Sequence, residues 1–263
     1  MLVESLDKLL ARLGDDDRVL DVGGWAAPLN RADWVIDLMP HETRGALPVG
    51  SFGPGPERFS AATWVQRDLC AHEPYPFEDD FFDLAVCTFT LEDIRDPIWV
   101  CEEMSRVAKA GLIEVPSLAD ELSWNVPEFS GGPWVGHDHH RWLCFTGPNS
   151  IEFMHKPHSL HAEWHATVSP RRSARLRPDQ RVQVLWWEGE LAARERVVIG
   201  AFPLEELERH LDSELRRTRA ELALRGVRRH GLRAARAVAW RARGLAGRLA
   251  RALAGRLARP FRS

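Results

Sequence analysis

The sequence predicts an α/β fold with a doubly wound, mostly parallel sheet, antiparallel strands added at one edge, and a helical tail at the carboxyl end. Three observations support this prediction. Short apolar runs separated by turn residues indicate buried strands, because a parallel sheet covered on both faces gives apolar runs rather than alternation. A helical pattern between two such runs forms a crossover unit. The alternation of strand and helix stops after Ser117, so any later strands are expected at an edge.

The first half of the chain supplies the predicted elements in order. Leucines recur at helical spacing from Leu2 to Leu13 and Gly14 follows as a stop signal, which predicts an amphipathic first helix. Residues 39–62 are rich in proline and glycine and predict a long surface loop with at most a short helix near its end. Five apolar runs predict the strands: Val19–Val22, Trp34–Leu38, Thr63–Leu69, Asp83–Cys87 and Leu112–Val115.

A second helix is predicted to begin at Asp96 and Pro97, an N-cap acceptor followed by proline at the first helical position. Gly111 predicts the end of this helix. Residues 150–156 and 181–200 predict further strands, the second segment with a bend inside it. These strands are expected to add antiparallel pairs at one edge of the sheet.

The charge of the chain is divided between an acidic body and a basic tail. Residues 222–263 contain 12 arginines and no acid, which leaves 23 basic and 38 acidic side chains in residues 1–221. Such a body repels nucleic acid, so no nucleic-acid partner is expected for it. We therefore predict one folded domain over residues 1–203 and a basic, Arg-rich helical tail over residues 204–263. The tail can lie on an anionic membrane surface, bind a protein partner, or remain a solvated and frayed helix.

The sequence shows no membrane span or secretion signal. No apolar run approaches the roughly 18 residues of a span, and acids occupy the amino-terminal positions where a secretory signal needs a basic and then an apolar stretch. A soluble, cytoplasmic protein is therefore expected, with attachment to a membrane surface through the tail left open. The four cysteines form no CxxC pair, which argues against a disulfide framework or a cysteine zinc site.

The most informative motif is VLDVGG at the end of the first predicted strand, followed by an acid at the end of the second. In an open α/β sheet, ligands bind beyond the carboxyl ends of the strands, where a glycine turn lets the backbone approach the ligand. Asp21, Gly23 and Gly24 would form this turn, and Asp37 can accept hydrogen bonds from both ribose hydroxyls. Glycines after a strand also occur in ordinary turns, which is the alternative for the motif taken alone.

The run from Val19 to Ser117 resembles the class I S-adenosylmethionine-dependent methyltransferases, and in particular their type 11 group. The matching segments are VLDVGG, WVIDL, RDLCAHEPYPFEDDFFDLAVCTFTLEDIRDP and EEMSRVAKAGLIEVPS. The resemblance implies a Rossmann-like methyltransferase fold with S-adenosyl-L-methionine as the cofactor. It places Asp21 and Gly23 at the methionine end of the cofactor and Asp37 at the ribose. It also implies that Asp68 and Leu69 lie at the adenine, with Cys87 and Thr88 under the cofactor.

The sequence departs from this family at Trp25 and Ala27, where the family has two more glycines. A glycine permits positive φ and close backbone approach, whereas tryptophan brings a large ring into the same turn. Trp25 can face a sulfonium cation through its ring, pack under the loop, or partly close the pocket. Asp68 also has a second interpretation, since an acid after an extended run can cap the following helix or remain solvated.

A second set of candidate residues is the histidine-rich segment His137-Asp138-His139-His140. In a strand, His137 and His139 would share one face, with Asp138 and His140 on the other. His137, His139 and His140 are the candidate catalytic residues, because neighbouring imidazoles suit a general base and its hydrogen-bonding partner. No spaced zinc signature is present, so no metal ligand is assigned, although two same-face histidines could also hold a metal with a third ligand. A solvated or structural role is the remaining alternative.

Together these features predict methyl transfer from S-adenosylmethionine to an unidentified acceptor. A small molecule or a glycan hydroxyl is preferred, because the acidic body offers no groove for nucleic acid. A methyltransferase-like binding or scaffold protein without turnover is the first alternative, since Trp25 stands in the cofactor turn. A metal-dependent hydrolase that uses His137 and His139 is the second.

Overall fold

The computed structural model describes residues 1–44, 50–124, 135–158, 160, 167–200, 202–215, 227 and 231. Contacts within the chain divide it into two units, Met1–Leu211 and Asp212–Ser263. The first unit holds every described strand. The predicted boundary between residues 203 and 204 stays a prediction, and almost all of the basic segment 222–263 lies outside the described residues.

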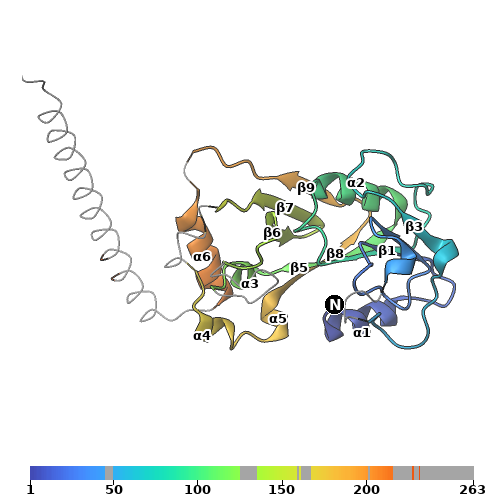
Figure 1. Ribbon diagram of the computed structural model, residues 1–263, viewed down its shortest axis with the longest axis horizontal. Coiled ribbons are helices and arrows are strands. Elements are labelled where there is room, and N and C mark those ends of the chain that lie inside the picture. Colours follow the sequence, from blue (N-terminus) through green and yellow to red (C-terminus); the bar gives the residue numbers. More distant parts are fainter. Residues whose placement is uncertain are drawn as a thin grey trace, which may run out of the picture. The chain divides into compact units, whose positions relative to one another are not determined.

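A six-stranded sheet forms the centre of the first unit. Its order is β3-β2-β1-β4-β5-β8, in which neighbours are parallel except that β8 runs antiparallel to β5 (Figure 1). The strands are β1 (Val19–Val22), β2 (Trp34–Asp37), β3 (Trp64–Gln66), β4 (Leu84–Thr88), β5 (Ala110–Pro116) and β8 (Val182–Glu188). The five parallel strands lie inside or within a residue or two of the apolar runs that predicted them. The strand order reverses between β1 and β4, which is where doubly wound sheets bind their ligands.

Helices cover the two faces of this sheet from opposite sides, α1 (Val3–Arg12) on one and α2 (Pro97–Val107) on the other (Figure 1). Leu9 of α1 joins one core cluster with Val19, Val35 and Val86, whereas Met104 of α2 belongs to the cluster on the other face. The predicted start of α2 is confirmed, since Asp96 accepts a hydrogen bond from the Trp99 N–H at 3.1 Å. A doubly wound α/β fold is therefore observed.

The prediction that Gly111 ends the second helix is wrong. The helix α2 ends at Val107, and Gly111 lies within β5. A Cβ atom at this glycine would lie 2.5 Å from the Ala85 carbonyl oxygen and from the Trp187 ring. Gly111 is therefore needed for close packing of β4, β5 and β8 and does not act as a helix stop.

The later strands only partly follow the prediction. β8 adds an antiparallel edge to the main sheet as expected, but β6 (Trp142–Gly147), β7 (Ser150–His155) and β9 (Ala192–Glu195) form a separate three-stranded sheet. The bend at Gly189, with φ of +70°, redirects the chain from one sheet to the other. The remaining elements are short helices η1 (His41–Thr43), η2 (Ala61–Thr63), α3 (Leu118–Glu121), α4 (Pro170–Ser173) and α5 (Pro178–Arg181), and the helix α6 (Leu204–Glu214). No described helix is both long and apolar enough to cross a membrane.

Candidate functional site

The candidate site begins with the glycine turn, residues 23–25, which follows β1 at the carboxyl edge of the sheet. Residues 23–33, all of them described, connect β1 to β2 without a helix. The Gly23 N–H donates to the Ile36 carbonyl oxygen at 2.9 Å, so the turn is tied to the end of β2. Gly23 has φ of +79°, and a Cβ atom there would lie 2.4 Å from Thr90 Oγ1. Only glycine fits this position without displacing the loop after β4.

The side chain of Asp21 lies close beneath Gly24 and leaves no space for a Cβ atom there. A Cβ atom at Gly24 would lie 2.6 Å from Asp21 Oδ2, and the same oxygen accepts the Leu29 N–H at 2.8 Å. Asp21 is almost fully buried. The pKa of Asp21 is raised to about 7, chiefly by burial, with a smaller contribution from the charge of Asp37; the Leu29 hydrogen bond acts in the opposite direction. Asp21 therefore anchors the segment that connects β1 to β2 through the Leu29 N–H.

Asp37 closes the other side of the turn. Its Oδ2 accepts the Trp25 N–H at 3.0 Å, and its Oδ1 accepts the Met39 N–H at 2.7 Å. Burial raises the pKa of Asp37, partly offset by these backbone hydrogen bonds. An ionised carboxylate has about four lone-pair sites, so two donors leave capacity for two more. The residues present therefore fit the ribose of a nucleoside cofactor, because both cradling glycines and a hydrogen-bonding carboxylate meet here.

Trp25 packs against the core on the α1 side. Its indole Nε1 donates to Thr43 Oγ1 at 3.0 Å, and its ring lies against the cluster that includes Leu9 and Leu29. Of the three roles that the sequence left open, packing is the one observed. The aromatic ring thus fills space beside the turn and fixes η1 to it.

Asp68 caps the turn that follows β3. Its Oδ1 accepts the Cys70 N–H at 2.9 Å and its Oδ2 accepts from Arg95 at 2.8 Å. The hydrogen bond from Arg95 lowers the pKa of Asp68. Leu69 is buried in the core. The structure thus connects Asp68 to the loop after β4, and its predicted contact with adenine stays a prediction.

Cys87 and Thr88 end β4 at the point where the strand order reverses. Cys87 is fully buried on the α2 face, and burial raises the pKa of its thiol. Thr88 is half-buried, and its carbonyl oxygen accepts from Thr90 Oγ1 at 3.2 Å. Cys87 therefore supports the floor of the site from within the core.

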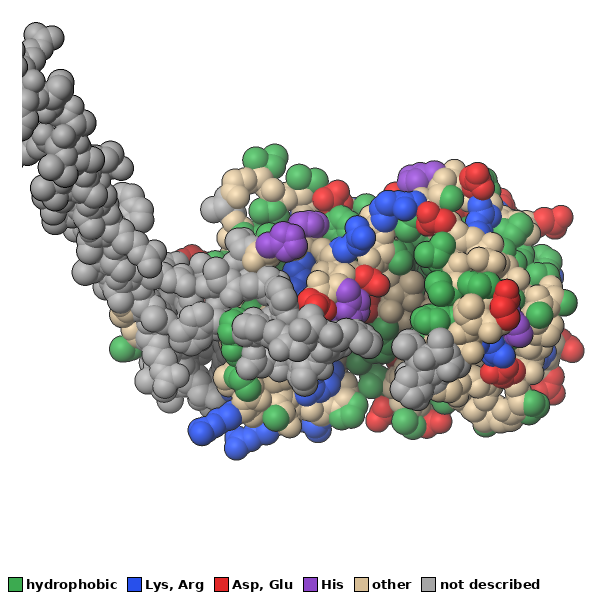
Figure 2. All heavy atoms as spheres, viewed as in Figure 1, with side chains coloured by type: hydrophobic (Ala, Val, Ile, Leu, Met, Phe, Trp, Pro, Cys, Tyr) green, Lys and Arg blue, Asp and Glu red, His purple; other side chains and the backbone are tan. Residues whose placement is uncertain are grey.

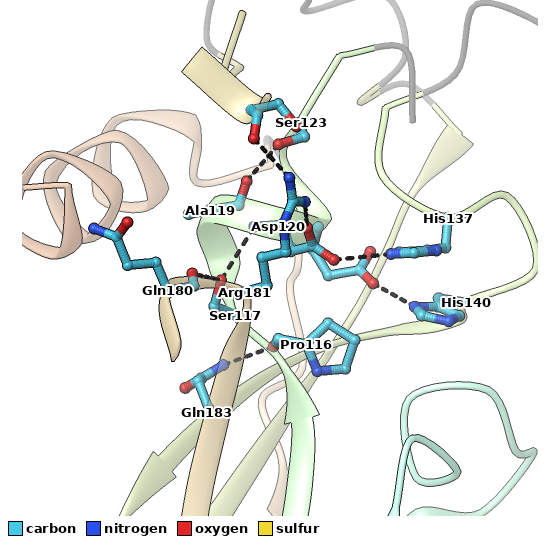
Figure 3. A network of polar contacts seen from close by, with 12 residues as sticks. Pro116, Ser117, Ala119, Asp120, Ser123, His137, His140, Gln180, Arg181 and Gln183 are labelled. Carbon is cyan, nitrogen blue, oxygen red and sulfur yellow. Dashed lines mark hydrogen bonds and ion pairs between the residues drawn. The ribbon is translucent and has the colours of Figure 1, made fainter. Parts of the chain in front are cut away.

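The second part of the site is a carboxylate–histidine cluster made of Glu92, Asp120, Glu121, His137, His140 and Lys156. Asp120 and Glu121 lie in α3, directly after β5, and the histidines precede β6. His137 Nε2 lies 3.0 Å from Asp120 Oδ2, and Arg181 forms an ion pair with the other Asp120 oxygen (Figure 3). The ring of His137 is thereby oriented by a carboxylate that is itself held in place.

Glu121 and His140 form the second carboxylate–imidazole pair of the cluster (Figure 3). Glu121 Oε2 accepts from Lys156 Nζ at 2.7 Å, and the same ammonium donates to the His137 carbonyl oxygen at 2.7 Å. Burial raises the pKa of Glu121, but the hydrogen bond from His140 and the charge of Lys156 outweigh it and lower the pKa to about 2. Burial lowers the pKa of His140, so the ring is neutral near pH 7.

The arrangement of the histidines differs from the prediction. Residues 137–141 do not form a strand, because β6 begins at Trp142. His137 and His140 therefore stack with ring centroids 4.4 Å apart, whereas His139 contacts His140 edge-on at 4.5 Å. The His139 side chain is 42% exposed, so it is the histidine that a ligand reaches first. Figure 2 shows histidine and acidic side chains side by side on the viewed face.

Glu92 lies in the turn after β4 and is fully buried. Its carbonyl oxygen accepts the N–H groups of Arg141 and Trp142 at 2.8 and 3.1 Å, which places it beside the cluster. Neither carboxyl oxygen has a hydrogen-bond partner among the described residues. Burial raises the pKa of Glu92 to about 8, and the charge of Glu121 adds to this effect.

Sequence reasoning missed Glu92, Asp120, Glu121 and Lys156. The acids of LEDIRD and LADEL resemble solvated surface residues, and no local pattern shows that they are buried. The one available signal was position, because both segments follow predicted strands of a parallel sheet. The neighbouring loop also joins the two parts of the site. Thr90 packs against Gly23, and two residues later Glu92 reaches the cluster.

The raised pKa of Asp21 predicts a pH-dependent stability. The folded state favours the protonated carboxyl, so this stabilisation is complete below about pH 4 and is lost as the pH rises through about 7. We expect Asp21→Asn, which keeps the oxygen that accepts the Leu29 N–H, to gain stability over the wild type between these values. The difference should be on the order of 4 kcal/mol. Urea unfolding of both proteins at a series of pH values measures it, and parallel profiles would contradict the assignment.

The fold is that of an α/β protein with a mostly parallel sheet, and the candidate site lies beyond the carboxyl ends of the parallel strands, where such sheets bind ligands. Residues 54–113 match the family model described as a methyltransferase domain. The predicted resemblance is thereby confirmed for this segment, which runs from the loop before β3 into β5. The predicted enzyme class and the S-adenosylmethionine cofactor agree with this family.

Solved structures give a more distant comparison. The chain is similar to the YcgJ protein from Bacillus subtilis, at 22% identity and a TM-score of 0.32, over 43% of this chain and 51% of that one. A putative methyltransferase from Bacillus halodurans gives 21% identity and a TM-score of 0.29, over 43% and 52% of the two chains. An S-adenosylmethionine-dependent methyltransferase from Mesorhizobium loti gives 17% identity and a TM-score of 0.30, over 51% of this chain and 63% of that one.

The aligned part spans about half the length of the first two of these structures. At such identities and TM-scores the likeness carries no argument about activity. None of the curated proteins matches the chain.

Proposed function

We propose that the chain transfers a methyl group from S-adenosylmethionine to a hydroxyl of a small molecule or glycan. The observation that carries this proposal is the loop after β4. It touches the glycine turn through Thr90, and the Glu92 carbonyl oxygen accepts the N–H groups of Arg141 and Trp142, which directly follow His140. The proposed cofactor half of the site (the glycine turn and its carboxylates) and the proposed acceptor half (the histidines) would thus meet at the point where the strand order reverses.

The cofactor half consists of the glycine turn and the carboxylates around it. Gly23 and Gly24 would let the backbone approach the methionine end, and Asp37 would accept from the ribose hydroxyls with its remaining lone pairs. Asp68 and Leu69 would lie at the adenine, and Cys87 and Thr88 under the cofactor. When bound, the cofactor supplies a methyl group activated by a sulfonium charge.

The acceptor half consists of the histidines, with His139 as the proton acceptor. His139 is the most exposed of the three, and its Nδ1 lies 3.5 Å from Asp138 Oδ1. His137 and His140 are paired with the buried carboxylates of Asp120 and Glu121 and shape the wall beside it. With the cofactor bound, transfer of its methyl group to the acceptor oxygen would release S-adenosylhomocysteine, with the electron pair of the carbon–sulfur bond left on sulfur. His139 would take up the proton of the acceptor hydroxyl.

Binding of S-adenosylhomocysteine by the full chain tests the proposal. Ligand at about 100 times its dissociation constant should add about 2.7 kcal/mol to stability, which raises the melting temperature by roughly 5 to 10 °C. Calorimetric titration supplies the dissociation constant independently. If neither cofactor form at millimolar concentration gives heat or a melting shift, a scaffold that keeps the fold without the cofactor becomes the better account.

We also propose that the basic segment 222–263 attaches the protein to anionic membrane surfaces, because it carries 12 arginines and no acid. The full chain should sediment with vesicles that contain phosphatidylserine, and added salt should weaken this binding because it screens the charges. A chain that ends at residue 221 should stay in the supernatant while melting like the full chain. Equal sedimentation of the two proteins would rule out the anchor and leave a protein partner as the alternative.

A further inference from the structure

Three side chains of the carboxylate–histidine cluster are placed as a set of metal ligands. One ligand atom from each of Glu121, His137 and His140 lies within 4.8 Å of the other two. They come from α3 and from the segment before β6, so two separate parts of the chain converge here. Two imidazoles and one carboxylate are a donor set that proteins use for catalytic zinc, with a further position for water or substrate.

The groups around this set orient it in the way that outer-shell residues orient metal ligands. His137 Nε2 faces Asp120 at 3.0 Å, and Arg181 holds that carboxylate from the other side. Lys156 donates to Glu121 Oε2 and thereby directs Oε1 toward His140. Ring and carboxylate orientations are therefore fixed before any ligand arrives.

Glu92 is an independent observation that points to a ligand. It is 0% exposed, and neither of its carboxyl oxygens has a hydrogen-bond partner among the described residues. An orphaned buried carboxyl costs free energy and requires an explanation, such as a catalytic role or a bound ion. Its electrostatic neighbours include Glu121 and His137, two of the three candidate ligands.

The geometry of Glu121 leaves one of its oxygens for a cation. Among the described residues, Arg181 forms an ion pair with Asp120 and Lys156 forms one with Glu121. Lys156 Nζ lies on Glu121 Oε2, and Oε1 faces His140. A divalent ion at Oε1 would therefore leave Lys156 on the other oxygen of the same carboxylate.

We propose that Glu121, His137 and His140 bind one divalent cation of the zinc class, with the buried carboxyl of Glu92 next to the site. The inference deepens the proposed function, on which its catalytic meaning rests, while metal binding itself is measurable without methyl transfer. A cation held by these residues would polarise the acceptor hydroxyl and lower its pKa. The proton then passes to His139 as the oxygen–methyl bond forms and the methyl–sulfur bond breaks.

Zinc titration of the full chain tests this site. After treatment with EDTA and buffer exchange, Zn²⁺ should bind with a stoichiometry of one and a dissociation constant well below about 10 μM. His140→Ala should weaken this binding at least 100-fold, and Glu92→Gln, which keeps the shape of the side chain, by about tenfold. His210→Ala is the matched control, because His210 is an exposed histidine on α6 outside the cluster, and it should bind like the wild type.

Two results would overturn the proposal. One is the lack of a site tighter than about 100 μM in the wild type. The other is full binding by a folded His140→Ala variant, which would assign zinc to surface histidines. If that variant does not fold, Co²⁺ bound to the wild type decides instead, because a low-coordinate site with nitrogen donors gives intense visible absorption and a hydrated surface ion does not. A melting shift with S-adenosylhomocysteine in the metal-free protein separates failure of this site from failure of the proposed function.

Discussion

Replacing His139 by alanine should lower turnover by about 10² to 10⁴, the usual contribution of a general base, while the affinity for S-adenosylhomocysteine stays unchanged. The physical reason is position. His139 is the exposed histidine of the segment and touches His140 edge-on, whereas the residues proposed to hold the cofactor follow β1 and β2. Initial rates with a methyl acceptor and calorimetric titration of the cofactor product measure the two quantities separately.

Two comparisons make the His139 experiment specific. His210→Ala removes an exposed histidine elsewhere and should leave both rate and affinity unchanged. His139→Gln keeps a hydrogen-bonding side chain that cannot take up a proton, so it should be as slow as alanine. If glutamine restores the rate, His139 positions the acceptor and does not act as its base. If alanine abolishes cofactor binding in a folded protein, its assignment to the acceptor half is wrong.

The parallel strands were predictable because they are buried on both faces. Burial on both faces requires continuous apolar runs, and such runs can be recognised without knowing their neighbours. The β1 prediction, Val19–Val22, matches the strand at both ends. The pairing of β7 with β9 was not predictable, because the two segments are about forty residues apart and no local pattern states which sheet a strand joins.

The candidate site was predictable where backbone geometry constrains the residue type. Gly23 and Gly24 are required by the close approach of Thr90 and Asp21, so the need for a tight turn is visible in the sequence as two glycines. No local sequence pattern marks the residues of the carboxylate–histidine cluster. His140 meets Glu121 and Lys156 only through the tertiary fold, and an acid in LADEL looks the same whether it is buried or solvated. The rings of His137 and His139 do approach each other, with centroids 6.1 Å apart, but not as neighbours on one face of a strand. His137 stacks more closely on His140, because the segment bends before β6.

Replacing Asp37 by alanine should weaken binding of S-adenosylhomocysteine at least tenfold. A carboxylate that accepts from ribose hydroxyls contributes about 1.5 to 3 kcal/mol for each desolvated hydrogen bond, and every 1.4 kcal/mol is about a factor of ten. The same carboxylate also accepts the Trp25 and Met39 N–H groups, so the variant should melt at a lower temperature even without ligand. The informative quantity is therefore the melting shift caused by the ligand, measured at one fixed concentration.

Asp33→Ala is the matched control for this experiment. Asp33 likewise accepts a backbone N–H, that of Val19 at 2.9 Å, but it precedes β2 and lies at the opposite edge of the sheet. Its loss should lower the melting temperature and leave the ligand-induced shift of roughly 5 to 10 °C in place. Asp37→Ala should lose most of that shift. If both variants keep the full shift, Asp37 only holds the glycine turn together, and the ribose must be bound by other residues.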